Sequence, residues 1–221
     1  MSSRGGLLGC AIAGATLAAA SILILPTGSG AAPTCFGKQA TIIRGAGNDR
    51  VQGTPGPDVI FTGKGDDTVA SGNGADYVCG GVGDDTVDTG NQDDFLDGDD
   101  GNDELHGYNG GDKIIGGAGR DFLDGRRGDD NVLLGGGGDD RLLGDSVLKG
   151  GAGDDKLNAA GYVASDPVPD RSSGGGGDDR ITGDENRDRL KGGGGNDRIN
   201  GRGGNDVCNG GAGNNTLLNC P

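Results

Sequence analysis

The sequence contains few of the residues that usually build catalytic centres. It has no tryptophan, four phenylalanines, three tyrosines and one histidine. No H-E-x-x-H, G-x-S-x-G or Walker phosphate-loop motif is present, so the spacings by which zinc proteases, α/β-hydrolases and P-loop enzymes are recognised are missing. No catalytic motif therefore favours an enzyme.

Positive charge is scarce as well. Nineteen lysines and arginines stand against 34 aspartates and glutamates, which gives a formal net charge of -15 and an isoelectric point of about 4.2. A surface that binds nucleic acid or an anionic membrane needs a basic footprint, so we exclude both as partners. With 53 glycines and 3% aromatic residues, this composition by itself is typical of a disordered chain.

A nine-residue repeat with a fixed phase argues against disorder, because an unselected low-complexity sequence would not preserve that phase. Ten units run without a gap over residues 44–133, and seven more follow after one inserted residue, Leu134. Position six of sixteen units is aspartate: Asp49, Asp58, Asp67, Asp76, Asp85, Asp94, Asp103, Asp112, Asp121, Asp130, Asp140, Asp155, Asp179, Asp188, Asp197 and Asp206. Asn215 takes this place in the last unit, and position eight is aliphatic except at Cys208. One carboxylate and one core-type side chain thus recur in every unit.

The repeat predicts short strands that stack into a solenoid. The residues after the aspartate alternate outward, inward and outward in a strand, so only position eight faces a core. Such a short strand is stable only when it is paired. We therefore expect each unit to pair with its equivalent two units away, at a distance of about 4.8 Å.

Stacking places the position-six aspartates in rows of like charge that need a cation. Calcium accepts about six to eight hard oxygen ligands in flexible geometry, whereas magnesium prefers a tighter octahedron. Zinc prefers histidine and cysteine ligands, which the turns lack. If each calcium ion brings two positive charges, about seven or eight ions cancel the net charge of -15. We predict multiple calcium ions as the cofactor, and a disordered chain without them.

The repeat resembles the RTX, or haemolysin-type, calcium-binding nonapeptide, whose pattern is G-G-x-G-x-D-x-U-x. The resemblance covers residues 44–218 and implies an all-β fold, a right-handed parallel β-roll (a β-solenoid). The repeat count gives it about 17 half-coils, and the cysteines considered below predict disulfide-closed ends. It also implies calcium between successive turns, bound by the position-six aspartates and by carbonyl groups of the glycines at positions two and four. The glycines predicted on this basis are Gly63, Gly65, Gly72, Gly74, Gly81, Gly83, Gly117, Gly119, Gly136, Gly138, Gly151, Gly153, Gly175, Gly177, Gly193 and Gly195.

Some units depart from the pattern, and we expect calcium to be weaker or absent there. The departures are Gln92 and Asn186 at position four, and Thr54, Asp99, Tyr108, Arg126, Asp184 and Arg202 at position two. The single histidine, His106, falls at an outward-facing position nine. We interpret it as an ordinary surface residue.

The chain divides into six segments. Residues 1–31 resemble an export signal peptide, with Arg4 before an apolar stretch, and an uncleaved signal would be the only contact with a membrane. We predict an N-terminal cap over 32–43, repeats over 44–158, a protruding loop over 159–173, repeats over 174–218 and a tail over 219–221. Residues 144–149 form a shortened unit in which Leu148 can occupy position eight. One continuous roll is expected, with two stacked rolls as the alternative.

Four cysteines remain after the predicted signal: Cys35, Cys79, Cys208 and Cys220. An even number fits an oxidising exterior and two disulfides. Three pairings are open, as are free thiols. Proximity in the sequence favours Cys35 with Cys79 and Cys208 with Cys220, one at each end, where a solenoid needs caps.

These observations predict a secreted, extracellular or cell-surface calcium-binding protein without catalysis, which folds when calcium binds. One alternative is an adhesion rod that binds an acidic cell-wall or extracellular polymer. Its binding face would consist of the basic position-seven residues Arg141, Lys156, Arg180, Arg189 and Arg198. The other alternative is a calcium-dependent extracellular hydrolase or polysaccharide-modifying enzyme.

Overall fold

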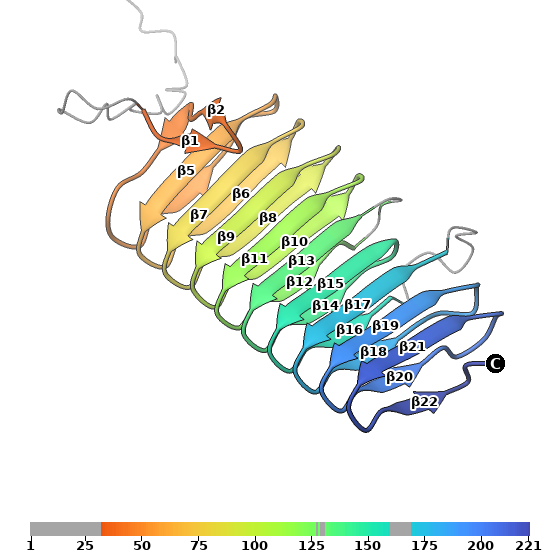
Figure 1. Cartoon of the computed structure of the whole chain (residues 1–221). Coiled ribbons are helices and arrows are strands. Elements are labelled where there is room, and N and C mark those ends of the chain that lie inside the picture. Colours follow the sequence, from red (N-terminus) through yellow and green to blue (C-terminus); the bar gives the residue numbers. More distant parts are fainter. Residues whose placement is uncertain (1–31, 127, 129–130, 160–168) are drawn as a thin grey trace, which may run out of the picture.

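The computed structural model describes residues 32–126, 128, 131–159 and 169–221, which form one rod of stacked turns (Figure 1). Two ten-stranded parallel sheets lie along the rod, and the chain alternates between them. A two-stranded antiparallel hairpin precedes the sheets. The predicted all-β parallel solenoid is confirmed. It has about nine turns, and its twenty strands exceed by three the 17 half-coils that the repeat predicts.

From β3 onward, odd-numbered strands form one sheet and even-numbered strands form the other, and we call these the odd sheet and the even sheet. The hairpin consists of β1 (Thr34–Cys35) and β2 (Lys38–Gln39). The odd sheet consists of β3 (Ile42–Ile43), β5 (Val59–Lys64), β7 (Tyr77–Val82), β9 (Phe95–Asp100), β11 (Lys113–Ala118), β13 (Val132–Gly137), β15 (Val147–Ala152), β17 (Arg171–Gly176), β19 (Arg189–Gly194) and β21 (Val207–Ala212). The even sheet consists of β4 (Arg50–Gln52), β6 (Thr68–Asn73), β8 (Thr86–Asn91), β10 (Glu104–Asn109), β12 (Phe122–Asp124), β14 (Arg141–Leu143), β16 (Lys156–Asn158), β18 (Arg180–Thr182), β20 (Arg198–Asn200) and β22 (Thr216–Leu218). No helix within the described residues has the length and apolar character of a membrane span.

The core between the sheets is a double column of position-eight side chains. Val51 pairs with Val69 in the even sheet and Ile60 pairs with Val78 in the odd sheet. This confirms the prediction that each unit pairs with its equivalent two units away. The aliphatic side chains of this column are at most 2% exposed from Val51 to Ile199. Nine spacings of about 4.8 Å make the rod about 43 Å long.

The repeat shifts by one residue near the middle of the rod. Leu133 of β13 is fully buried and pairs with Ile114, whereas Val132 pairs with Lys113 and is only half-buried. The inserted residue therefore lies before Asn131, and its prediction at Leu134 is wrong. A turn tolerates an extra residue, but an extra residue in a strand would move every later side chain to the opposite face.

The roll stays continuous across its irregular segment, as predicted. Leu148 is buried, β15 pairs with β17, and β16 pairs with β18. Strand β17 begins at Arg171, so the last three residues of the predicted loop belong to the roll. Ser172 occupies the core position between Leu148 and Leu190. Its buried hydroxyl has no hydrogen-bond partner among the described residues.

Both predicted disulfides are present near the ends of the rod. Cys35 pairs with Cys79 and Cys208 pairs with Cys220, with Cα–Cα distances of 5.7 and 5.9 Å. These distances fit ordinary disulfide geometry. The prediction of disulfide-closed ends is confirmed.

Only part of the predicted N-terminal cap covers the end of the rod. Strand β3 pairs with β5 and extends the odd sheet by one strand. The hairpin instead packs on the outer face of the odd sheet, where Phe36 makes edge contacts with the rings of Tyr77 and Phe95. Those two rings are stacked with their centroids 4.8 Å apart. The disulfide to Cys79 on β7 fastens the hairpin to this face.

Candidate metal centre

Glycines at positions two and four determine the shape of the turns that precede the strands. All sixteen glycines predicted as ligands have φ between 107° and 133°, a region that is open mainly to glycine. Stacking requires glycine as well, because a Cβ on Gly81 or Gly83 would overlap the carbonyl oxygen of Gly63 or Gly65. Carbonyl oxygens of one turn thus lie directly against the next turn.

The position-six residues that precede even strands form a continuous ladder, which we call the even row. Its members are Asp49, Asp67, Asp85, Asp103, Asp121, Asp140, Asp155, Asp179, Asp197 and Asn215. The main-chain N–H of each member donates to Oδ1 of the next, at 2.7–3.0 Å. Every turn is therefore held to its neighbour by a carboxylate or, at the end, by the Asn215 amide.

The residues in the equivalent place before odd strands form the odd row, which is regular only in part. Its members are Asp58, Asp76, Asp94, Asp112, Asn131, Ser146, Asp170, Asp188 and Asp206. The same N–H to Oδ1 bonds link the first four, and Asn131 Oδ1 accepts the next one from Asp112 at 2.9 Å. Asn131 thus occupies the place that the sequence assigned to Asp130, which lies outside the described residues.

The repeat pattern missed three members of the odd row, Asn131, Ser146 and Asp170. Asn131 stands two residues before the buried Leu133, and this spacing could have revealed it. Asp170 stands two residues before Ser172 and four before a run of glycines. It escaped notice because serine, rather than an aliphatic residue, fills the core position. Ser146 donates its N–H to Asp170 Oδ1 at 2.7 Å, which continues the row across the irregular segment.

The second carboxylate oxygen of most aspartates is buried. Of the predicted ligands, fourteen are at most 5% exposed and Asp49 is half-buried. Oδ2 is buried without a hydrogen-bond partner among the described residues in Asp67, Asp76, Asp85, Asp94, Asp103, Asp112, Asp121, Asp140, Asp155, Asp179, Asp197 and Asp206. A Cβ on Gly98 would overlap Asp103 Oδ2 and lie 2.6 Å from the Gly116 carbonyl oxygen. Carboxylate and main-chain oxygens of neighbouring turns therefore converge, an arrangement that is costly unless a cation joins them.

Burial raises the pKa of many of these carboxyl groups. Desolvation, partly offset by a main-chain hydrogen bond, raises the pKa from 3.8 to about 7 in Asp94, Asp103, Asp155 and Asp179. The charges of neighbouring aspartates raise each of these pKa values further. A divalent cation reverses this preference, because it stabilises the charged form.

The turns that depart from the consensus fall into two groups. Asp99, Tyr108, Arg126 and Arg202 at position two and Gln92 at position four keep a positive φ, of 55–80°, which is smaller than the 107–133° of the sixteen predicted glycines.

Thr54 and Asp184 change the turn instead. The main-chain N–H of each donates to Oδ2 of the aspartate four residues later, at 2.6 Å for Asp58 and 2.9 Å for Asp188. The Thr54 hydroxyl also donates to Asp58 Oδ2, at 3.1 Å. Asp58 thus has donors that the regular turns lack, which supports the expectation of weaker calcium in this turn.

His106 differs from the exposed residue that the sequence suggested. It lies on the outer face of β10 but is only 7% exposed, because Tyr108 and Phe122 cover its ring. Its Nε2 lies 3.1 Å from Glu104 Oε1, and its Nδ1 lies 3.9 Å from Asp124 Oδ2. A ring two residues along the same strand and a diagonal neighbour on β12 bury this outward side chain, and the alternation of one strand does not show such contacts.

The fold and its turns define a parallel β-solenoid with cation-binding turns. The family model for the RTX calcium-binding nonapeptide repeat matches residues 43–78, 80–161 and 169–217. The chain belongs to this family, and calcium is the cofactor that its repeats bind. Comparison with curated proteins found no match.

Proposed function

We propose that the chain is exported and folds into this roll when it binds calcium outside the cell, where it has a structural role. The observation that carries the proposal is the pair of rows in which buried carboxylate oxygens recur turn after turn without a donor among the described residues. At the low calcium concentration of the cell interior these carboxylates repel one another, which keeps the chain unfolded and competent for export. The two disulfides support an oxidising compartment. The predicted signal, 1–31, lies outside the described residues.

The residues that would hold calcium between consecutive turns of one row are the position-six aspartates, through their carboxylates, and the glycines at positions two and four, through their carbonyl oxygens. The hydrogen bond to each Oδ1 orients the carboxylate, and the absence of a Cβ at the glycines lets the main-chain oxygens approach. The calcium ion neutralises the charge, and the protein residues fix its position.

A calcium titration of residues 32–221 tests this proposal. Circular dichroism should change cooperatively from a disordered to a β-rich spectrum, with about fifteen bound ions if most turns are occupied and about five if only the regular units are. An unchanged spectrum from chelator to millimolar calcium would refute coupled folding. Asp103→Asn should reduce the number of bound ions, whereas the matched change at the exposed Asp100 should not.

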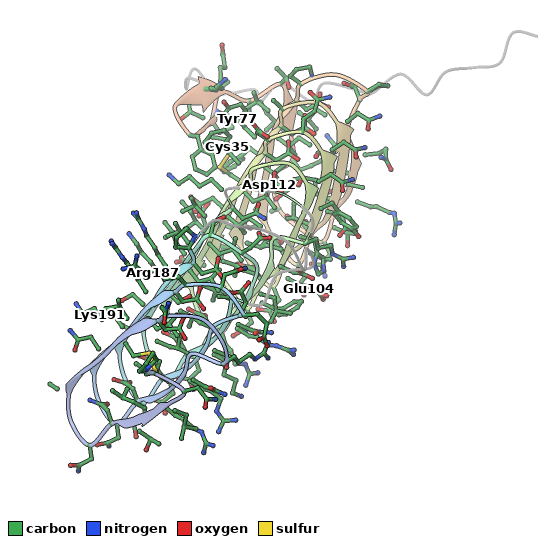
Figure 2. The ribbon with its side chains drawn as sticks, turned by 90° about the vertical axis from the view of Figure 1, so that its right-hand side faces the viewer. Cys35, Tyr77, Glu104, Asp112, Arg187 and Lys191 are labelled. Atoms are coloured by element: carbon green, nitrogen blue, oxygen red, sulfur yellow. A yellow bond between two sulfur atoms is a disulfide. The ribbon has the colours of Figure 1, made fainter. Side chains whose placement is uncertain are left out.

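A basic face supports a second candidate function, binding of an acidic cell-wall or extracellular polymer. The outward residues Arg141, Lys156, Arg180 and Arg198 are exposed and directly paired from β14 to β20. Arg189 lies in the odd sheet beside Arg171, so it belongs to a separate basic row. Lys191 projects from the surface of the same half of the rod (Figure 2). In-register cations of this kind suit a polyanion.

Retention on an immobilised acidic polysaccharide tests this second candidate. Retention should fall as salt rises, and Arg180→Glu combined with Lys156→Glu should abolish it. Lys64→Glu, an exposed charge reversal near the other end of the rod, serves as the control. Equal retention of both variants would refute a specific basic face.

A catalytic role is the third candidate, and the repeat itself weakens it. Adjacent carboxylates such as Asp66 and Asp67 resemble an acid and base pair, but similar pairs recur in many turns, as metal ligands do and catalytic residues do not. Assays of the calcium-loaded chain on polysaccharides, esters and peptides should detect no turnover. Turnover above the background rate would support the alternative hypothesis of a hydrolase or polysaccharide-modifying enzyme.

A further inference from the structure

Three carboxylates meet at the place where the regular repeat is interrupted. Asp170, Asp184 and Asp188 each bring one oxygen within 4.8 Å of the others. Asp170 precedes β17 and Asp188 precedes β19, which are paired neighbours in the odd sheet. Asp184 comes from position two of the turn that leads to Asp188, where regular turns carry glycine.

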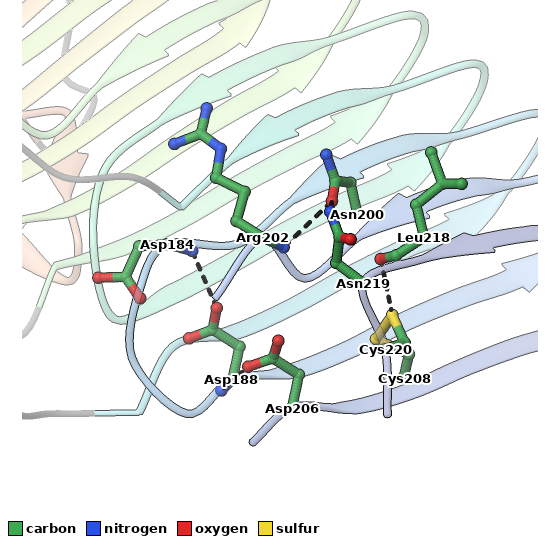
Figure 3. Close-up of a disulfide and its surroundings, with 9 residues drawn as sticks. All are labelled: Asp184, Asp188, Asn200, Arg202, Asp206, Cys208, Leu218, Asn219 and Cys220. Atoms are coloured by element: carbon green, nitrogen blue, oxygen red, sulfur yellow. Dashed lines mark hydrogen bonds between the residues drawn. A yellow bond between two sulfur atoms is a disulfide. The ribbon is translucent and has the colours of Figure 1, made fainter. Parts of the chain in front are cut away.

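One carboxylate of this group has an oxygen that lacks a donor. Asp188 is fully buried, and its Oδ2 accepts the Asp184 N–H at 2.9 Å. Its Oδ1 has no hydrogen-bond partner among the described residues. In Figure 3 the free oxygen of Asp188 points toward the Asp184 carboxylate. The regular turns leave Oδ2 without a donor, whereas here the main-chain N–H of position two donates to Oδ2 and Oδ1 is the oxygen left without a donor.

The other two carboxylates are held in place by their neighbours. Asn186 donates its N–H to Asp184 Oδ1 at 2.6 Å and its side-chain amide to Asp184 Oδ2 at 2.8 Å. Asp170 is 3% exposed, and its Oδ1 accepts the Ser146 N–H at 2.7 Å. This bond joins residues on opposite sides of segment 160–168. In the folded roll, all three carboxylates are therefore fixed by main-chain or side-chain donors.

No cation of the protein balances these three charges. Within the described part of the chain, neither lysine nor arginine forms an ion pair with any of the three. Each carboxylate therefore faces two like charges at short distance, and two of the three are buried. A regular pair of turns brings only its two position-six carboxylates together. Additional negative charge and a rigid ligand frame both increase calcium affinity.

We propose that Asp170, Asp184 and Asp188 bind a calcium ion more tightly than the regular turns do, and that this ion holds the first turn after segment 160–168 to the turn that follows it. The inference rests on the proposed calcium-dependent folding, and it adds a site with a ligand that the repeat consensus does not contain. It reverses the sequence-based expectation that calcium is weak or absent at the Asp184 unit. The ion links the turn after segment 160–168 to the next turn, where the sequence alone leaves a gap in the repeat.

Calcium-binding isotherms of the purified chain in competition with a chromophoric chelator test the proposal. The wild type should show one site that is tighter than all others. Asp184→Asn should weaken that site by at least about tenfold, since one of its three charges is lost, and leave the remaining sites unchanged. Asp99→Asn is the matched control, because Asp99 is also an aspartate at position two but keeps a positive φ of 71° and an exposed side chain.

A second variant keeps the test valid if Asp184→Asn fails to fold. Asp184→Gly restores the consensus residue and should convert the tight site into an ordinary one, with the β-rich spectrum retained in calcium. If the wild type binds calcium and both Asp184 variants keep the tight site, the inference is wrong while the proposed function stands. If the wild type binds no calcium, both are wrong.

Discussion

Removal of calcium should reverse the pH dependence of stability. The relevant groups are the buried aspartates, of which Asp94 and Asp103 have a pKa raised from 3.8 to about 7, mainly by burial. Between these two pH values the folded chain holds protons that the unfolded chain has released. The free energy of unfolding of the calcium-free chain therefore falls as pH rises from about 4 to about 7.

The magnitude follows from proton linkage. One fully shifted carboxyl changes the free energy of unfolding by about 1.4 kcal/mol per pH unit within this window. Neighbours in a row share protons, so we count half of this effect for each group. Asp94 and Asp103 alone then remove about 2 to 3 kcal/mol between pH 5 and pH 7, a large part of the roughly 5 to 15 kcal/mol that stabilise a domain. Since further aspartates act in the same direction, the chain should be unfolded at pH 7 without calcium.

Urea unfolding at pH 5 and pH 7, followed by circular dichroism with disulfides intact, measures this effect. In chelator the chain should show an unfolding transition at pH 5 and be unfolded already without urea at pH 7. In saturating calcium the midpoint should be lower at pH 5 than at pH 7, because protons compete with calcium for the carboxylates. Asp94→Asn should make the calcium-free dependence shallower, since it removes one titrating group. A calcium-free chain that is equally or more stable at pH 7 would refute the reasoning.

Three further changes test the core, the turns and the N-terminal hairpin. Ser172→Val should raise the free energy of unfolding in calcium by about 1 to 2 kcal/mol in urea titrations, because a buried hydroxyl without a partner is replaced by methyl groups; a loss of stability would contradict the described core. Gly136→Ala should lower the free energy of unfolding by at least about 2 kcal/mol and reduce calcium binding, because Gly136 has a φ of 122° and a Cβ there would meet the neighbouring turn. Gly137→Ala is the control and should change neither quantity much, because the space around Gly137 is open. Replacing Cys35 and Cys79 by serine should lower the free energy of unfolding by about 4 kcal/mol, as expected for a disulfide that spans 44 residues. An unchanged thermal midpoint would contradict a stabilising role of this disulfide.

Much of the fold could be predicted because a strict period fixes which side each residue faces. The aliphatic residue at position eight and the aspartate at position six face the core and the turn wherever the period holds. The repeat cannot be aligned uniquely where a turn has an extra residue. The insertion near Asn131 allows two alignments that differ by one position. Only strand pairing, with Leu133 opposite Ile114, distinguishes them. The unit that contains Ser172 was not predicted for a different reason, because a polar residue occupies its core position.

The sequence by itself determined the class of fold, the metal and the positions of most carboxylates, because each depends on local chemistry that recurs every nine residues. The tertiary structure alone decided which turns share a row and which oxygens lack a donor. It divided the basic residues between two sheets and covered His106 with its neighbours. It also brought Asp170 and Asp184 to Asp188, in the turns that follow the interruption. These results depend on stacking between turns, and a nine-residue pattern carries no information about which irregular turns become neighbours.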